Sequence, residues 1–174
     1  MSDLPSSQIH DTYTPKVGGR LHYFQENWQA LTSDPFILNA IKGYKLEFKA
    51  TLPPSRDKPP RSYRLSETER KALSVEINKL YLKGVIEPCS KEKGDFVSNV
   101  FSRPKKNGGT RLILDLTDLN KFLPYQHFKM ENIHTASQLL SNYSYMASVD
   151  LQDAYYAVPI HPTHRKFFRF IWEG

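Results

Sequence analysis

The sequence predicts an α+β fold in which an antiparallel hairpin is supported by helices. Ser66 is followed three residues later by a glutamate, which is the capping-box pattern at the start of a helix. An Asn-Gly pair at Asn107 separates two β-like runs, 96–102 and 110–116, which favours a hairpin. A third run, 145–151, alternates as a half-buried strand does and leads directly into a short helical segment.

The first third of the chain predicts a leader and a linker. Residues 1–17 are polar and aperiodic, and we interpret them as a flexible lead-in. In the next region, 18–64, a helix is expected from Asp34, its cap, to about Gly43. The run 51–63 is rich in proline and basic residues, which predicts an extended basic linker.

The helix that begins at Ser66 is expected to end at Gly84, because glycine favours the left-handed conformation at helix C-termini. In the second strand of the hairpin, leucines alternate with other residues, so a buried leucine face leaves Arg111 on the opposite side. Asp115 and Asp118 are expected to shape the turn that follows.

Towards the C-terminus, 131–140 predicts a modest helix and 145–151 a strand whose last residues include Asp150. Pro159 limits the helix after that strand to about two turns. The aromatic and β-branched run 166–172 predicts a further strand.

Composition favours a polyanionic partner. The chain has 174 residues, a net charge of +6 and a pI near 9.3. Basic residues dominate 42–64 and 91–111, where solvated charged faces are the alternative explanation. The lone Cys89 excludes an intrachain disulfide, and no apolar run is long enough to span a bilayer. We therefore expect an intracellular protein, in the cytoplasm or nucleus, with no membrane partner.

Asp150 is the first candidate for chemistry. A carboxylate that ends a strand before a short helix can bind a hard divalent cation, while backbone amides near Asp153 and Ala154 can donate hydrogen bonds to a phosphate. Two-metal phosphoryl transfer requires such an arrangement. The alternative is that Asp150 only caps the following turn. For Asp153, capping of the short helix ranks ahead of a role at the phosphates.

The pattern Asp150-x-x-x-Ala154-Tyr155, followed by Val158-Pro159-Ile160, resembles the first palm motif of reverse transcriptases. The resemblance implies that Asp150 binds both metal ions and that the main-chain carbonyl of Leu151 assists. It also implies that Tyr155 lies under the sugar and selects deoxynucleotides, the alternative being an ordinary core aromatic.

The segment 100–116 is similar to the fingertip hairpin of the same family. There, a lysine near the turn and an arginine on the returning strand hold the incoming triphosphate. The resemblance thus assigns Arg111 together with Lys105 or Lys106 to nucleotide binding, and Lys106 is nearer the turn. A guanidinium binds phosphate bidentately and a lysine adds a mobile charge, although solubility alone also explains a charged hairpin.

Weaker similarities at 18–44 and 128–172 favour the DIRS-like group of retrotransposons. The resemblance implies the fingers (65–144) and the start of the palm (145–174) of a right-hand polymerase. Its expected activity is RNA-directed DNA synthesis with Mg²⁺ or Mn²⁺, with an RNA or DNA template-primer and deoxynucleoside triphosphates as partners. RNase H and recombinase regions follow in DIRS-like elements.

The family's second acidic motif, two adjacent aspartates, is expected beyond Gly174. With Asp150 alone the metal site is incomplete, so we expect no activity from this chain by itself. Two other classes of function remain open. One is a non-catalytic nucleic-acid-binding remnant or co-opted module, and the other is a protein-interaction fragment that recruits a partner through an unpaired strand.

Overall fold

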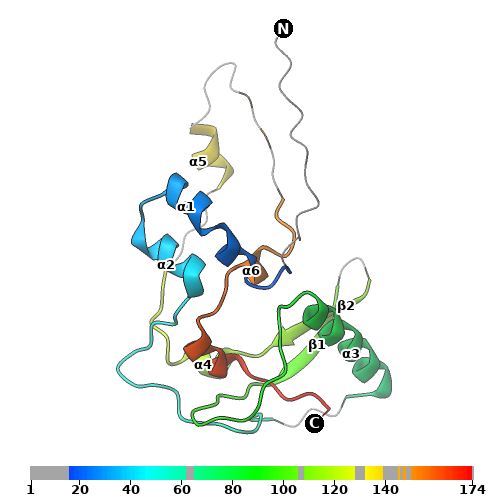
Figure 1. Cartoon of the computed structure of the whole chain (residues 1–174). Coiled ribbons are helices and arrows are strands. Elements are labelled where there is room, and N and C mark those ends of the chain that lie inside the picture. The colour runs from blue at the N-terminus through cyan, green and yellow to red at the C-terminus, as the bar shows by residue number, and fades with distance from the viewer. Residues whose placement is uncertain are drawn as a thin grey trace.

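The computed structural model describes residues 16–61, 65–105, 108–127, 132–138, 145, 147 and 150–173. Figure 1 shows several of the short helices in one part of the molecule and the hairpin with its long helix in another. The elements in chain order are η1 (Arg20–Phe24), α1 (Gln25–Leu31), α2 (Pro35–Gly43), α3 (Glu67–Leu82), β1 (Val100–Pro104), β2 (Thr110–Leu114), α4 (Thr117–Asn120), α5 (Ile133–Gln138), α6 (Ala154–Ala157) and η2 (Pro162–Phe168).

Both helices predicted from capping residues are present. Asp34 caps α2 by accepting a hydrogen bond from the Phe36 amide at 2.8 Å. Ser66 and Glu69 form the reciprocal capping box of α3, since each side chain binds the other residue's amide. These bonds satisfy amides that have no partner within a helix, which fixes where each helix begins.

Gly84 ends α3 as expected. Its φ of +67° is left-handed, its amide donates to the Tyr81 carbonyl, and the Val85 amide donates to the Leu80 carbonyl. This pair of bonds is the Schellman motif. On the inner face of α3, Leu73 is fully buried, and the helix packs on the hairpin.

The hairpin is antiparallel, and its strands are shifted by a few residues from the predicted runs. Val100 pairs with Leu114 at one end and Pro104 with Thr110 at the other. Arg111 is exposed and its neighbour Leu112 is partly buried, which confirms the predicted alternation at this position.

A core cluster forms where Phe96, Leu119 and Phe167 are buried together. Phe48 contacts Phe167 edge-on, with ring centroids 4.8 Å apart. Apolar side chains from four separate segments thus meet in one cluster.

The described part of the basic proline-rich run, 51–61, forms no helix or strand, and it is docked on the protein. Arg56 forms a parallel bridge with Phe96: the Arg56 amide donates to Asp95, and the Val97 amide donates to Arg56. Val97 forms a second bridge with Arg169. The segments around 56, 97 and 169 therefore lie side by side.

A charged cluster fixes the C-terminal segment to this region. Arg169 donates to the Asp95 carboxylate at 2.7 Å and to the Ser90 carbonyl at 2.7 Å. Arg169 also lies 3.2 Å from the Glu92 carboxylate. Because the Asp95 side chain is only 4% exposed, removing Arg169 would leave a buried carboxyl group without its ion-pair partner.

One predicted strand is wrong, and another lies partly outside the described residues. Of the run 145–151, the structure describes 145, 147, 150 and 151, which belong to no strand; Tyr145 and Leu151 are exposed. The first part of 166–172 belongs to η2. Pro162 stands in the first turn of η2, and His161 accepts a bond from the Thr163 amide at its start. Beyond η2, Arg169 makes only an isolated bridge.

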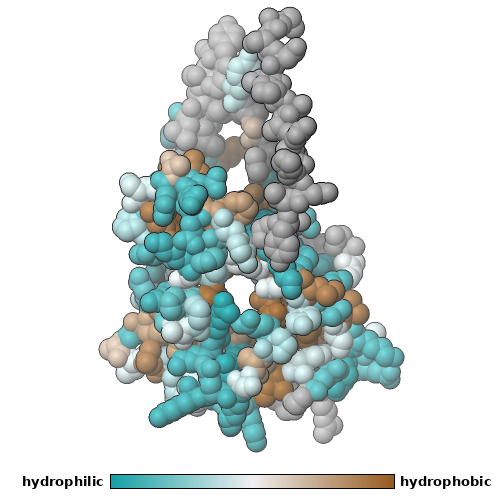
Figure 2. Space-filling model, viewed as in Figure 1, coloured by the Kyte–Doolittle hydropathy of each residue, from teal (hydrophilic) through white to brown (hydrophobic). Residues whose placement is uncertain are grey.

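The expected helix at 131–140 is present as α5, and the short helix before Pro159 is present as α6. Figure 2 shows apolar patches among hydrophilic side chains on the visible face, near α1 and near α3. In the described parts of the chain, no helix combines the length and apolar character that crossing a bilayer requires.

Candidate functional site

The first part of the candidate site is the tip of the hairpin. The Lys105 amide donates to the Gly109 carbonyl and the Gly108 amide to the Lys105 carbonyl, both at 3.1 Å. Gly108 and Gly109 both have φ of +82°, a conformation that glycine adopts without strain. A Cβ added at either glycine would meet no atom within 4 Å, so the turn projects into open space.

The cations predicted to hold phosphates lie on this hairpin. Lys105 and Arg111 are exposed, and neither forms an ion pair with any described residue. Lys106 lies outside the described residues. The charges of Lys105 and Arg111 are thus available to a ligand.

The second part is the segment before and within α6. Asp150 is exposed and makes no hydrogen bond with the described residues. Leu151 is 65% exposed and Tyr155 is 96% exposed. The exposure of Tyr155 contradicts the alternative of a core aromatic, and Asp150 caps no turn in the described part of the chain.

Asp153 does not cap α6 with its side chain, contrary to the interpretation that ranked first. It occupies the N-cap position with a left-handed φ of +58° and no capping hydrogen bond. Its carboxylate instead accepts a bond from Lys83 Nζ at 2.5 Å. The ion pair competes with capping, because one short side chain cannot reach both groups.

A strap formed by Gly18 and Gly19 joins the same two elements. The Gly18 amide donates to the Lys83 carbonyl at 3.0 Å, and the Gly19 amide donates to the Tyr156 carbonyl at 2.8 Å. The end of α3 and the start of α6 are therefore connected by both backbone and side chain. Among the described residues, no hydrogen bond or ion pair joins the hairpin cations to Asp150.

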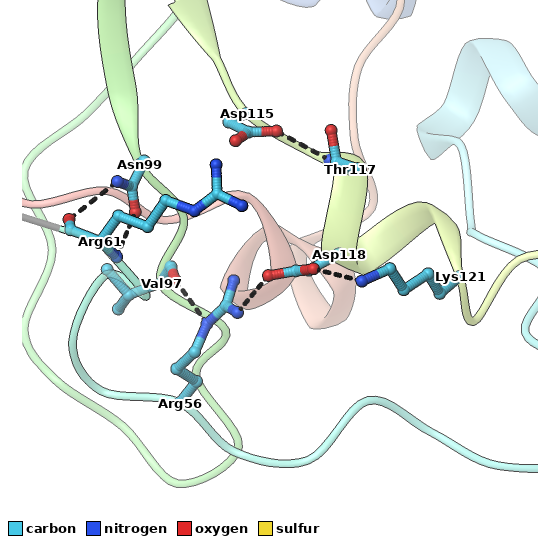
Figure 3. Close-up of polar contacts among 8 residues, drawn as sticks. All are labelled: Arg56, Arg61, Val97, Asn99, Asp115, Thr117, Asp118 and Lys121. Carbon is cyan, nitrogen blue, oxygen red and sulfur yellow. Dashed lines mark hydrogen bonds and ion pairs between the residues drawn. The ribbon is translucent and has the colours of Figure 1, made fainter.

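A polar network at the base of the hairpin was missed by the sequence reasoning (Figure 3). Arg56 Nη1 donates to Asp118 at 2.9 Å, Arg56 Nε donates to the Val97 carbonyl at 2.9 Å, and Lys121 Nζ donates to Asp118 at 2.7 Å. Hydrogen bonds from Lys121 and Arg56 hold the pKa of the Asp118 carboxyl below its usual range. The guanidinium of Arg56 also lies 4.0 Å from the centre of the Phe96 ring.

Two further interactions extend this network. Asn99 and Arg61 exchange hydrogen bonds, with the Asn99 side-chain amide 2.8 Å from the Arg61 carbonyl. Asp115 accepts from the Thr117 amide at 3.1 Å, and hydrogen bonds with Thr117 lower the pKa of Asp115. The two aspartates thus shape the turn after the hairpin, as predicted.

A hollow of about 330 Å³ lies beside the network. It is lined by Pro54, Ser55, Arg56, Phe96, Asp118, Lys121 and Phe122. The proline-rich composition of 51–63 was the available signal, because prolines hold a segment extended enough to dock along another. Composition does not show where such a segment docks.

Comparison with known proteins relates this arrangement to the Pol polyproteins of retroviruses. No model of a known protein family matches the chain. Over 119 residues it is 28% identical to the Pro-Pol polyprotein of simian foamy virus type 1, a match that covers 67% of this chain and 10% of that protein. It is also 29% identical over 117 residues to the Gag-Pol polyprotein of gibbon ape leukemia virus. This match covers 65% of this chain and 7% of that protein.

The fold is similar to that of part of a solved structure, the protease-reverse transcriptase of prototype foamy virus. The TM-score is 0.51 at 20% identity, and the match covers 88% of this chain and 23% of that chain. At this identity the likeness shows the fold. The chain spans about a tenth or less of the curated relatives described above. Because these relatives are retroviral, the DIRS-like assignment stays a prediction.

Proposed function

We propose that this chain supplies the fingers and the beginning of the palm of a retroelement reverse transcriptase. In this proposal, the complete protein synthesises DNA on a template by two-metal nucleotidyl transfer. The observation that carries the proposal is the exposed hairpin with Arg111 and Lys105 unpaired, in a chain similar to retroviral Pol polyproteins over about two thirds of its length. The DIRS-like origin belongs to the proposal as well.

The metal site of this proposal is Asp150, with the carbonyl of Leu151. The residues fit a hard cation, because Asp150 offers exposed carboxylate oxygens that no described cation occupies. Bound Mg²⁺ or Mn²⁺ would stabilise charge on the attacking and leaving oxygens. In the family that the chain resembles, a second acidic motif provides further ligands for the metal ions. The 174-residue chain alone is therefore expected to be inactive.

The other residues act on the nucleotide in this proposal. Arg111 and Lys105 or Lys106 neutralise the triphosphate, and the exposed ring of Tyr155 packs under the sugar, where it rejects a 2′-hydroxyl. Amides near Asp153 and Ala154 approach the phosphates. The ion pair with Lys83 makes Asp153 a residue that orients α6.

Binding to a primer-template tests the proposal. The affinity of the 174-residue chain for a labelled RNA–DNA primer-template is expected to fall linearly, on logarithmic axes, between about 50 and 200 mM salt. Arg111→Ala should weaken binding of a deoxynucleoside triphosphate, while Asp150→Asn should leave metal-free primer-template binding unchanged. Binding that is absent or insensitive to salt would contradict the proposal.

A non-catalytic nucleic-acid-binding module is the second candidate, favoured by the net charge of +6 and the unpaired hairpin cations, which need no chemistry. Sequence beyond position 174 distinguishes the two functions. Two adjacent aspartates on a downstream hairpin favour the enzyme. Robust metal-dependent primer extension by the 174-residue chain would overturn the expectation that Asp150 needs further carboxylates.

A further inference from the structure

Two arginines face each other across the hairpin. The register pairs Arg103 of β1 directly with Arg111 of β2. The neighbouring bonds, Lys105 to Gly109 and Asp115 to Asn99, place this pair at a hydrogen-bonded position of the ladder. Their Cα atoms are therefore about 5.5 Å apart, and their side chains leave the same face of the hairpin.

The two positive charges have no compensating carboxylate in the described part of the chain. Arg103 and Arg111 are both exposed, and neither makes an ion pair there. The acids that follow β2 have other partners: Asp115 accepts a hydrogen bond from the Thr117 amide, and Asp118 binds Arg56 and Lys121. Like charges directly opposite each other destabilise a strand pair.

The guanidinium of Arg103 has a defined position as well. It lies 5.4 Å from the centre of the Phe101 ring, two residues earlier on the same face of β1. A cation over an aromatic ring is attracted by the ring's π-electrons and loses part of its rotational freedom. Arg103 is thus oriented beside Arg111 before any ligand binds.

We propose that Arg103 and Arg111 form a paired-guanidinium site for the polyphosphate of a nucleotide, with Arg103 as a second phosphate-binding residue beside Arg111. The inference rests on the proposed function, since Arg111 is the triphosphate residue of that proposal. Two guanidinium groups at this separation bind neighbouring phosphoryl groups, each with two parallel hydrogen bonds. An anion between them also removes their repulsion.

Phosphate oxygens are shared by a nucleotide and by a nucleic-acid backbone, and we assign the site to the nucleotide. Linked phosphoryl groups concentrate several negative charges within the short span between the two side chains. Each backbone phosphate carries a single negative charge, so a nucleic-acid strand presents a lower density of charge to the two side chains. The hairpin therefore complements a polyphosphate better than a strand.

Titration calorimetry with inorganic tripolyphosphate tests the site in the 174-residue chain. Arg103→Ala and Arg111→Ala should each weaken binding about tenfold, which corresponds to the loss of one charge-assisted contact. Arg103→Lys keeps the charge but loses the bidentate geometry, so its affinity should fall between those of the wild type and Arg103→Ala. Arg70→Ala is the matched control, because Arg70 is exposed on α3 and has no ion pair there.

Thermal unfolding provides an independent readout. Without an anion, Arg103→Ala loses both the repulsion from Arg111 and the contact with Phe101, so its unfolding temperature serves only as the baseline for the variant. With tripolyphosphate, the wild type should gain more stability than the variant. A purely structural role for Arg103 predicts that tripolyphosphate stabilises the wild type and the variant equally, and this result would overturn the proposal.

The outcomes separate this inference from the proposed function. If Arg103→Ala binds tripolyphosphate as Arg70→Ala does while Arg111→Ala binds weakly, the paired site is wrong and the proposed function stands. If Arg103→Ala weakens the binding of a 5′-hydroxyl oligonucleotide but not the binding of tripolyphosphate, the ligand is the nucleic-acid backbone. The assignment to a nucleotide is then wrong. If primer-template binding is itself absent, the proposed function has failed.

Discussion

At the scale of single residues, His164 couples the N-terminal region to η2. Its Nδ1 accepts a hydrogen bond from the Leu46 amide at 2.9 Å, and its ring contacts Phe48 and Phe167. Burial, and then the charges of His161, Lys45 and Lys166, lower the pKa of His164 below its ordinary value of 6.5. The bond requires an unprotonated Nδ1, which agrees with this direction.

We expect the stability of the chain to fall in mild acid because of His164. A folded-state pKa below that of the unfolded chain means that the unfolded state binds the proton first. The contribution is therefore fully present above about pH 6.5 and is lost as the pH falls through 6.5 towards the folded-state pKa. Denaturant unfolding midpoints, determined at several pH values between about 7.5 and 5.5, measure this loss of stability.

His164→Asn is the matched variant, since the Asn side-chain oxygen can accept the Leu46 bond without titrating. Its midpoint should change less than that of the wild type over the same pH range. If the denaturant midpoints of the wild type and of His164→Asn change equally with pH, the bond to Leu46 does not depend on protonation of His164. The carboxyls with lowered pKa values, among them Asp115 and Asp118, titrate at lower pH and do not interfere.

Residue-level predictions succeeded where the interaction is local. Asp34 and Ser66 bind amides within a few residues, so the sequence pattern contains both partners. The capping role predicted for Asp153 was wrong, because its partner, Lys83, is 70 residues away in the chain. Arg103 was missed for a similar reason, since its opposition to Arg111 depends on the register of the hairpin.

At the scale of elements, the glycine strap decides how α3 and α6 are joined. A Cβ at Gly18 would lie 2.0 Å from the Gly84 carbonyl oxygen and 2.7 Å from the Val85 nitrogen. Both atoms belong to the backbone that forms the Schellman motif of α3. A side chain at position 18 is therefore incompatible with the strap.

We expect Gly18→Ala to detach the strap. The bonds from Gly18 to Lys83 and from Gly19 to Tyr156 should break, so the Gly19 amide should exchange its hydrogen with solvent faster. Hydrogen–deuterium exchange followed by NMR measures this, and amides in the middle of α3 should keep their protection. Arg70→Ala is the control, because Arg70 is exposed on α3 and makes no ion pair with the described residues. Unchanged exchange at Gly19 in Gly18→Ala would contradict the strap.

Helices and strands were predicted correctly where the signals that fix them lie within the same stretch of sequence. The hairpin and α3 contain their own turn and cap signals, and both are present. The run 166–172 has the composition of a strand, but a strand also needs a continuous ladder of hydrogen bonds. In this run the structure gives a single bridge, between Arg169 and Val97, and the earlier residues belong to η2. Pattern alone does not show whether the ladder forms.

For the molecule as a whole, the α+β class followed from these local signals, whereas the packing did not. The expected linker of basic residues and prolines is docked through Arg56, which bridges to Phe96 and binds Asp118. Contacts between segments far apart in the chain determine such docking, and composition is silent about them. The same holds for Asp95 and Arg169.

Exposed apolar side chains lead to a prediction about the whole chain. Ile133 is 88% exposed and Tyr145 is fully exposed. They belong to a region, 125–155, that contributes several large apolar side chains to the surface, namely Tyr125, Ile133, Tyr145, Leu151 and Tyr155. Single exposed apolar residues are ordinary, but several from one region favour association.

We expect the purified 174-residue chain to self-associate through this region. Light scattering should give a molar mass that rises with protein concentration above that of the 20.2 kDa chain. The triple substitution Ile133→Ser, Tyr145→Ser and Leu151→Ser should lower the association, because it removes apolar area that the fold leaves in water. Leu52→Ser is the control, since Leu52 is 68% exposed in the docked proline-rich run, outside 125–155. A monodisperse monomer at all concentrations would show that these side chains cause no association, and equal effects of the triple variant and the control would place the contact elsewhere.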